Sequence, residues 1–294
     1  MFICSLHFSN SVFIGPRHTW TQLWLKSVRR MSAGFIEGRS TRSGGRGSQG
    51  YHSLLVLRWL KKVGRTTTLV LLPGLDGTEV FFKPLLAALP KWIKPVVVTY
   101  PTSGANHYSD LLTVVRAAVE DSKEFYVLGW SFSGPLALML AAKERSKVLG
   151  VILCASFIRS PLPRLSWLRF AITSPVVHCV RLMRRTPLLF YNRSTDILRR
   201  DKAATLARVP SRILAIRAQA ILALDARDCL RGCQRPVLYI AGSRDRVVPS
   251  WNAEEVVREF PSTKVVTIDG PHLALYTNPS AAVDAIVGFM SESA

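Results

Sequence analysis

The stretch Gly129-Trp130-Ser131-Phe132-Ser133-Gly134 decides how this chain folds. It follows the apolar run 125–128 and precedes residues 136–142, whose apolar spacing predicts a helix. A strand that leads through a serine between small residues into a helix predicts a nucleophile elbow, a tight turn that projects the serine hydroxyl into open space. Small residues must stand two positions before and after the serine, and these are Gly129 and Ser133. Ser133 cannot be the nucleophile, because its own second neighbour is Pro135.

Two further motifs each follow a predicted strand. The run 235–242 is followed by Asp245, and the run 264–268 leads through Gly270-Pro271 to His272. Taken singly, a turn aspartate and a surface histidine are ordinary alternatives. Together with Ser131 they come in the order Ser, Asp, His, which is the chain order of the α/β-hydrolases and differs from that of chymotrypsin or subtilisin.

We therefore predict a catalytic triad of Ser131, Asp245 and His272. Two other acidic residues are weaker candidates for the acid. Asp269 precedes the Gly-Pro turn, and Asp225 belongs to a segment with helical spacing.

A fourth motif is the strand-like run 69–72 followed by Pro73-Gly74-Leu75-Asp76-Gly77. No Gly-Lys-Ser or Gly-Lys-Thr sequence follows, which excludes a P-loop. On these motifs the chain is identified as a member of the α/β-hydrolase superfamily over about residues 66–289. Its Gly-Trp-Ser elbow is similar to that of carboxylesterases resembling the pimeloyl-carrier-protein methyl esterase of biotin synthesis.

The resemblance implies a fold and a site. The fold is α/β, a mostly parallel central sheet flanked by helices with an inserted helical lid. The backbone N–H groups of Leu75 and Phe132 would form the oxyanion hole, with Pro73 standing where the family commonly has histidine. It implies no metal and no organic cofactor.

The pattern along the chain agrees with that fold. Strands are predicted over 54–60, 68–72, 95–100, 124–130, 148–155, 236–241 and 264–268. Helices are predicted over 78–89, 108–121, 133–144, 251–259 and 279–290. This alternation predicts βαβ units, so the strands' C-terminal ends should bring the predicted site residues to one rim.

Three regions are expected. Residues 54–156 and 236–294 form the α/β-hydrolase core, and residues 157–235, which lack a strand-like run, form the helical lid insertion. Residues 1–53 are a basic leader whose segment 39–50 has no apolar side chain to bury, which predicts disorder. We interpret the leader as a misassigned N-terminal extension, with an organellar transit peptide as the alternative.

The net charge of +20 is concentrated in two segments. Residues 1–65 hold 11 Lys or Arg against one acidic residue, and residues 157–235 hold 16 against four. An Arg-rich lid could be a solvated surface, or it could dock an acidic partner such as an acyl-carrier protein or an anionic membrane near residues 167–170. Nucleic acid is not expected as a partner, because no aromatic and basic stacking pattern appears.

The cysteines and the hydropathy bear on location. Five cysteines are an odd number, and unpaired thiols are typical of a reducing compartment. Cys229 and Cys233 have no histidine or second cysteine pair nearby, so zinc is not expected. No apolar run approaches the roughly 18 residues of a membrane span. We predict a cytoplasmic protein, or an organellar one if the leader is genuine.

The predicted activity is cleavage of carboxylic esters through an acyl-enzyme. A serine at position 131, rather than an aspartate, disfavours dehalogenase and epoxide hydrolase chemistry. Phe81, Phe82 and Trp130 are candidates for an apolar acyl pocket, with a core role as the alternative. A thioesterase or acyltransferase acting on a carrier-linked acyl group, and a non-catalytic ligand-binding homologue, remain open.

Overall fold

The structure is a computed structural model that describes residues 66–161, 163–183 and 196–293. The predicted leader 1–53 and the predicted strand 54–60 lie outside these residues. No helix in the described ranges is long and apolar enough to cross a membrane.

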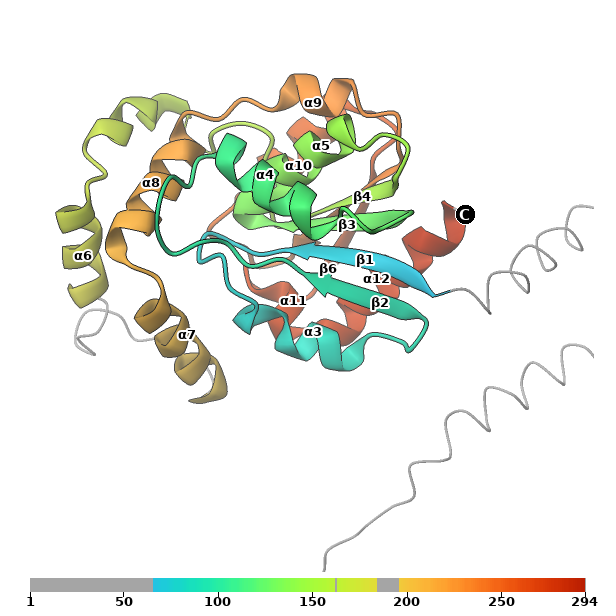
Figure 1. Cartoon of the computed structure of the whole chain (residues 1–294), viewed down its shortest axis with the longest axis horizontal. Coiled ribbons are helices and arrows are strands. Elements are labelled where there is room, and N and C mark those ends of the chain that lie inside the picture. Colours follow the sequence, from blue (N-terminus) through green and yellow to red (C-terminus); the bar gives the residue numbers. More distant parts are fainter. Residues whose placement is uncertain (1–65, 162, 184–195, 294) are drawn as a thin grey trace, which may run out of the picture. The chain divides into compact units, whose positions relative to one another are not determined.

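One parallel sheet lies at the centre of the described residues, with the strand order β2-β1-β3-β4-β5-β6 (Figure 1). Its strands are β1 (Thr67–Leu72), β2 (Ile93–Val97), β3 (Phe125–Trp130), β4 (Val148–Cys154), β5 (Val237–Gly242) and β6 (Lys264–Ile268). The predicted parallel α/β sheet is thus confirmed. The prediction for β2 was wrong at both ends, because the strand begins two residues earlier and ends three residues earlier than expected. Pro95 fits within β2 because this is an edge strand, where a missing backbone donor is tolerated.

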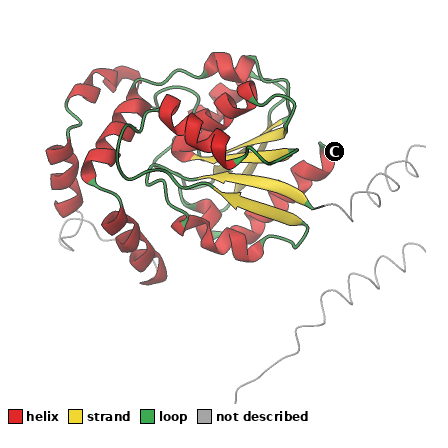
Figure 2. Ribbon diagram, viewed as in Figure 1, coloured by secondary structure: helices red, strands yellow, loops and turns green. Residues whose placement is uncertain are grey.

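The inner strands β1, β3, β4 and β5 are buried on both faces over most of their length, as their apolar runs require, whereas the edge strands β2 and β6 are partly exposed. Along β1, Val70 and Leu72 pack into one hydrophobic cluster, while Leu69 and Leu71 pack into the other. This alternation follows the two-residue period of a strand. Figure 2 shows helices on both sides of the yellow strands.

The flanking helices lie close to where the sequence predicts them, except for α11 (Ala274–Thr277), which was not predicted. They are the 3-10 turn η1 (Val80–Phe82) and the helices α3 (Lys83–Ala88), α4 (Tyr108–Ala118), α5 (Gly134–Lys143), α10 (Trp251–Glu259), α11 (Ala274–Thr277) and α12 (Pro279–Glu292). Buried residues of α4, α5 and α10 belong to the cluster of Val70, and those of α3, α11 and α12 belong to the cluster of Leu69.

A helical insertion separates β4 from β5, as predicted. It contains η3 (Pro163–Phe170), α6 (Ser174–Met183), α7 (Asp196–Arg208), α8 (Ser211–Leu222) and α9 (Arg227–Arg231). The chain enters and leaves it through two antiparallel segments, where Arg159 pairs with Asp225 in an isolated β-bridge. The Ala226 N–H donates to the Ile158 carbonyl at 2.7 Å, and the Ser160 N–H donates to the Leu224 carbonyl at 3.1 Å.

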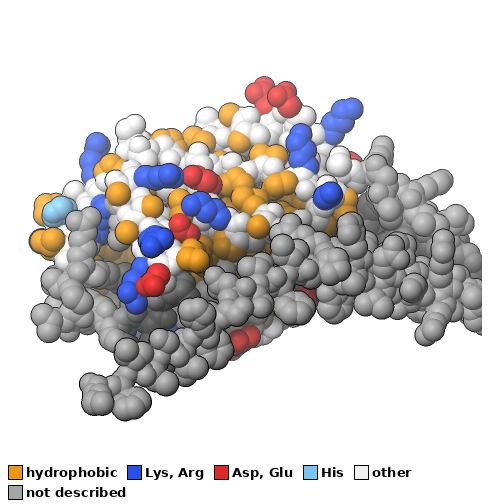
Figure 3. Space-filling view, turned by 90° about the horizontal axis from the view of Figure 1, so that it is seen from below, with side chains coloured by type: hydrophobic (Ala, Val, Ile, Leu, Met, Phe, Trp, Pro, Cys, Tyr) orange, Lys and Arg blue, Asp and Glu red, His pale blue; other side chains and the backbone are white. Residues whose placement is uncertain are grey.

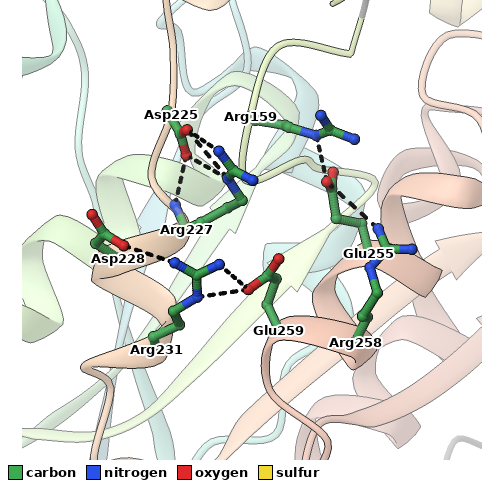
Figure 4. A network of polar contacts seen from close by, with 8 residues as sticks. All are labelled: Arg159, Asp225, Arg227, Asp228, Arg231, Glu255, Arg258 and Glu259. Atoms are coloured by element: carbon green, nitrogen blue, oxygen red, sulfur yellow. Dashed lines mark hydrogen bonds and ion pairs between the residues drawn. The ribbon is translucent and has the colours of Figure 1, made fainter.

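Ion pairs link the base of the insertion, where the chain enters and leaves it, to α10 (Figure 4). Glu255 of α10 is 2% exposed and pairs with Arg159 and Arg258. Arg231 of α9 reaches Glu259 at 2.7 Å. Because α10 follows the loop of Asp245, the network links the base of the insertion to the rim of the sheet.

Candidate active site

The predicted elbow is a strained turn at the end of β3. Ser131 has φ 53°, one of two positive values found at described residues other than glycine. Such a conformation costs about 1–3 kcal/mol and persists only where its surroundings impose it. A Cβ at Gly129 would collide with the Ser133 carbonyl, and one at Gly134 would collide with the Ser156 hydroxyl. Both glycines are therefore required by close backbone approach.

Three side chains meet at the C-terminal ends of β3, β5 and β6. The Nε2 atom of His272 lies 2.9 Å from the Ser131 Oγ, and its Nδ1 atom lies 2.8 Å from the Asp245 Oδ2. His272 is 17% exposed and Asp245 is 6% exposed, so the pair is shielded while the histidine stays accessible. The structure thus brings together the residues that the sequence predicts as a triad, and their catalytic role stays a prediction.

Asp245 is held as a carboxylate. Burial alone would raise its pKa, but hydrogen bonds from His272 and from the backbone N–H groups of Val248 and Val247 bring the pKa below the ordinary 3.8. A charged Asp245 favours a proton on the His272 Nδ1, which leaves Nε2 free to accept from Ser131.

The two alternative acids are engaged elsewhere. Asp269 pairs with Arg244 at 3.1 Å and accepts from the Ser243 hydroxyl at 3.0 Å. Asp225 pairs with Arg227 at 2.6 Å. Of these carboxylates only Asp245 is hydrogen-bonded to His272, which favours Asp245 as the acid.

The predicted oxyanion loop follows β1. The Gly77 N–H donates to the Gly74 carbonyl at 3.0 Å, and Gly77 has φ 72°. Asp76 accepts from the backbone N–H of Thr78 at 2.9 Å and from the Thr78 hydroxyl. Leu75 sits half-buried in this turn.

Phe132, the second predicted oxyanion residue, is anchored by its side chain. It is fully buried, and its ring stacks on Tyr108 with 4.8 Å between centroids. The Tyr108 hydroxyl also donates to the Phe132 carbonyl at 2.9 Å. These contacts fix the peptide that follows Ser131, and the roles of the Leu75 and Phe132 N–H groups stay predictions.

The three predicted pocket residues form a buried aromatic cluster. Trp130 lies 5.5 Å from Phe82 and 6.1 Å from Phe81 between ring centroids. The Trp130 Nε1 donates to the His272 carbonyl at 3.4 Å. All three side chains are 8% exposed or less and belong to the hydrophobic core. Their contact with an acyl group stays a prediction.

Sequence reasoning missed three polar residues around the site. The Ser156 hydroxyl donates to the Ser131 carbonyl at 2.6 Å, and the Tyr100 hydroxyl lies 2.5 Å from the Ser133 hydroxyl. Arg217 of α8 is fully buried and bonds to the oxyanion loop. Arg217 could have been noticed in the sequence, because the apolar spacing of 213–221 places this arginine on the buried face of the predicted helix.

The insertion exposes apolar and basic side chains together. Trp167 is 64% exposed and Phe170 is 75% exposed, with the Arg169 guanidinium 4.7 Å from the Phe170 ring centroid. Figure 3 shows hydrophobic side chains among Lys and Arg side chains on one face of the described residues. Across those residues, no group of three or more His, Cys, Asp or Glu side chains could hold a metal ion.

The fold and the site together define an α/β hydrolase. The chain belongs to the alpha/beta hydrolase family, whose sequence model matches residues 69–286. Within that family it is a distant homologue of the pimeloyl-[acyl-carrier protein] methyl ester esterase of Xylella fastidiosa, with 30% identity over 72% of this chain and 90% of the esterase.

Two other relatives are a hydrolase and an ester synthase by name. The putative carbamate hydrolase RutD of Azorhizobium caulinodans is 25% identical over 78% of this chain and 93% of its own. The chloroplastic phytyl ester synthase 1 of Arabidopsis thaliana is 38% identical, but the match spans only 17% of that protein and 36% of this chain.

Solved structures share the fold. A hydrolase from Pseudomonas aeruginosa superposes with a TM-score of 0.63 at 21% identity, over 76% of this chain and 90% of that one. MenH from S. aureus superposes with a TM-score of 0.65 at 16% identity, over 78% and 95%.

Proposed function

We propose that the protein is a serine hydrolase that cleaves carboxylic esters through an acyl-enzyme. The observation that carries the proposal is that one imidazole, His272, is hydrogen-bonded on one side to the Ser131 hydroxyl and on the other to the Asp245 carboxylate. The positive φ of Ser131 supports it, because strained backbone of this kind clusters at functional sites. The esterase and hydrolase relatives point to the same chemistry.

The proposed reaction has two halves. The Ser131 Oγ attacks the ester carbonyl carbon while His272 Nε2 takes the hydroxyl proton. The oxyanion accepts hydrogen bonds from the N–H groups of Leu75 and Phe132, each worth about 3 kcal/mol of barrier in comparable enzymes. Collapse of this intermediate breaks the C–O bond, and His272 protonates the leaving alcohol. Water then repeats the attack on the acyl-enzyme and releases the acid and the free serine.

Two other acyl-transfer reactions use the same site. One is hydrolysis of a carrier-linked thioester, and the other is transfer of the acyl group to an acceptor alcohol instead of water. Either reaction is favoured if simple esters are hydrolysed slowly. The exposed basic and aromatic side chains of the insertion favour an acidic carrier protein or an anionic membrane as the source of the substrate. The unpaired described cysteines agree with a cytoplasmic or organellar location.

The test is the initial rate on p-nitrophenyl esters from acetate to palmitate, for the full chain and for Ser131→Ala. We expect activity that is lost in the variant, and labelling of Ser131 by a fluorophosphonate. A variant that folds and retains the wild-type rate would sink the assignment of Ser131. A folded wild type that neither turns over these esters nor reacts with the fluorophosphonate would favour the non-catalytic alternative.

A further inference from the structure

Arg217 joins the helical insertion to the predicted oxyanion loop. It lies in α8, and no other lysine or arginine in the described ranges has a buried side chain. A buried guanidinium is costly unless its donors are satisfied. Such a group inside a helix of otherwise apolar and small buried residues therefore calls for an explanation.

All five N–H groups of this guanidinium have acceptors. Nη1 donates to the carbonyls of Leu75 at 2.9 Å and Asp76 at 2.8 Å. Nη2 donates to the Pro101 carbonyl at 2.9 Å and to the Asn106 Oδ1 at 2.8 Å. Nε donates to the same Asn106 oxygen at 3.0 Å. This is the full donor capacity of an arginine.

These bonds complete a wider pattern in the loop. Five successive carbonyls, from residue 73 to residue 77, each accept a hydrogen bond: from the Ser133 hydroxyl, the Gly77 N–H, Arg217 twice and the Tyr100 N–H. The Leu75 N–H, in contrast, has no acceptor within the described residues. The carbonyls of residues 73–77 are all held, so the orientation of the Leu75 N–H is set by its neighbours.

The charge of Arg217 also suits this place. Burial lowers its pKa to about 10, so the guanidinium remains a cation at neutral pH. Its carbon lies 5.4 Å from the centroid of the Tyr100 ring, which favours a cation. A fixed positive charge behind the loop favours negative charge developing in front of it.

We propose that Arg217 is a positioning residue that aims the Leu75 N–H at the oxyanion, so that the placement of the insertion controls the oxyanion hole. The inference rests on the proposed esterase function. Arg217 does not touch substrate in this scheme. It acts on the transition state through the backbone of Leu75, and ground-state binding of the ester should not depend on it.

The test compares Arg217→Lys, Arg217→Gln and Asn106→Ala with the wild type. Arg217→Lys keeps a buried cation but has at most three donors and no planar fork. Asn106→Ala removes the acceptor of two Arg217 bonds and leaves the guanidinium in place, so it carries the test if the charge-removing variant does not fold. Arg212→Gln is the matched control, because Arg212 is exposed on the same helix.

The readouts are Tm, kcat, KM and the inhibition constant of a trifluoromethyl ketone that carries the acyl chain of the best ester. The ketone forms a hemiketal oxyanion on Ser131, so it depends on the hole as the transition state does. We expect kcat to fall about 10- to 100-fold with KM nearly unchanged, which is less than the roughly 100- to 1,000-fold for complete loss of one oxyanion donor, because the Leu75 N–H is misdirected and not removed. The inhibition constant should rise in parallel with the fall in kcat/KM, and Arg212→Gln should match the wild type.

Two results would overturn the inference while leaving the esterase function standing. One is folded Arg217 variants that retain the wild-type kcat and inhibition constant. The other is a loss of activity that follows Tm and raises KM without weakening the ketone. A wild type that is inactive on esters and unlabelled at Ser131 instead overturns the proposed function, and the inference with it.

Discussion

The side-chain hydroxyl of Ser133 donates to the backbone carbonyl of Pro73, so the turn that carries Ser131 is tied to the loop that carries Leu75. The usual elbow has a glycine at this position. Here the hydroxyl is fully buried and also contacts the Tyr100 hydroxyl at 2.5 Å. The departure from the usual pattern therefore adds a cross-link between the two halves of the predicted oxyanion hole.

Removing this cross-link should cost both stability and rate. Ser133→Ala leaves the buried Pro73 carbonyl and Tyr100 hydroxyl short of a partner, and we expect a loss of about 1–3 kcal/mol in the free energy of unfolding. Because the loop is loosened, kcat should fall more than KM changes. Urea unfolding and ester kinetics measure the two effects. Ser291→Ala, at an exposed serine of α12, is the control and should change neither.

Two glycines have the same backbone conformation, but only one of them lies against Arg217. Comparing their alanine variants therefore distinguishes the effect of backbone strain from the effect of contact with Arg217. Gly77 has φ 72° and Gly104 has φ 71°. A Cβ at Gly77 would collide with the Arg217 guanidinium, whereas one at Gly104 meets nothing within 4 Å. In both alanine variants the left-handed backbone conformation should lower the free energy of unfolding by about 1 kcal/mol. Only Gly77→Ala should also reduce kcat, and equal kinetics for the two variants would contradict a role for the contact.

The elbow should not tolerate a side chain at Gly129. A Cβ there would meet the Ser133 carbonyl and the Gly134 backbone, which have no room to retreat. We expect Gly129→Ala to abolish ester turnover and lower Tm by several degrees. Gly288→Ala, in α12 with open space around it, should raise stability slightly, because alanine is the better helix former. Differential scanning calorimetry compares the pair.

The lowered pKa of Asp245 predicts acid-sensitive stability. A carboxylate whose pKa is lower in the folded state stabilises the fold above its unfolded pKa, and this contribution is lost as pH falls through the folded value. The stability difference between wild type and Asp245→Asn should therefore be present at pH 5 and shrink below pH 3.8. Urea titrations from pH 5 to pH 3 measure it. A difference that does not change with pH over that range would contradict the assigned contacts.

Most of the fold could be predicted from local sequence patterns. Apolar runs of strand length, separated by helical spacing, predict six described strands and their flanking helices, because burial on both faces demands continuous apolar residues. The predicted strand 95–100 was misplaced at both ends, because pairing with β1 begins at Ile93 and the strand ends at Val97. The parallel order then brings Ser131, Asp245 and His272 to one rim, as chain order alone indicated.

Contacts over long sequence separations could not be predicted in the same way. Arg217 and Leu75 are 142 positions apart, and nothing near either residue specifies the other. The apolar spacing of 213–221 indicates that residue 217 faces inward, but it does not say which acceptors the guanidinium meets there. By itself the sequence determined the elements, their order and the three residues at the rim, because these depend on local periodicity and on the geometry of parallel strands. Only the tertiary structure decided which insertion side chain is buried against the loop, because that depends on how α8 packs on the core.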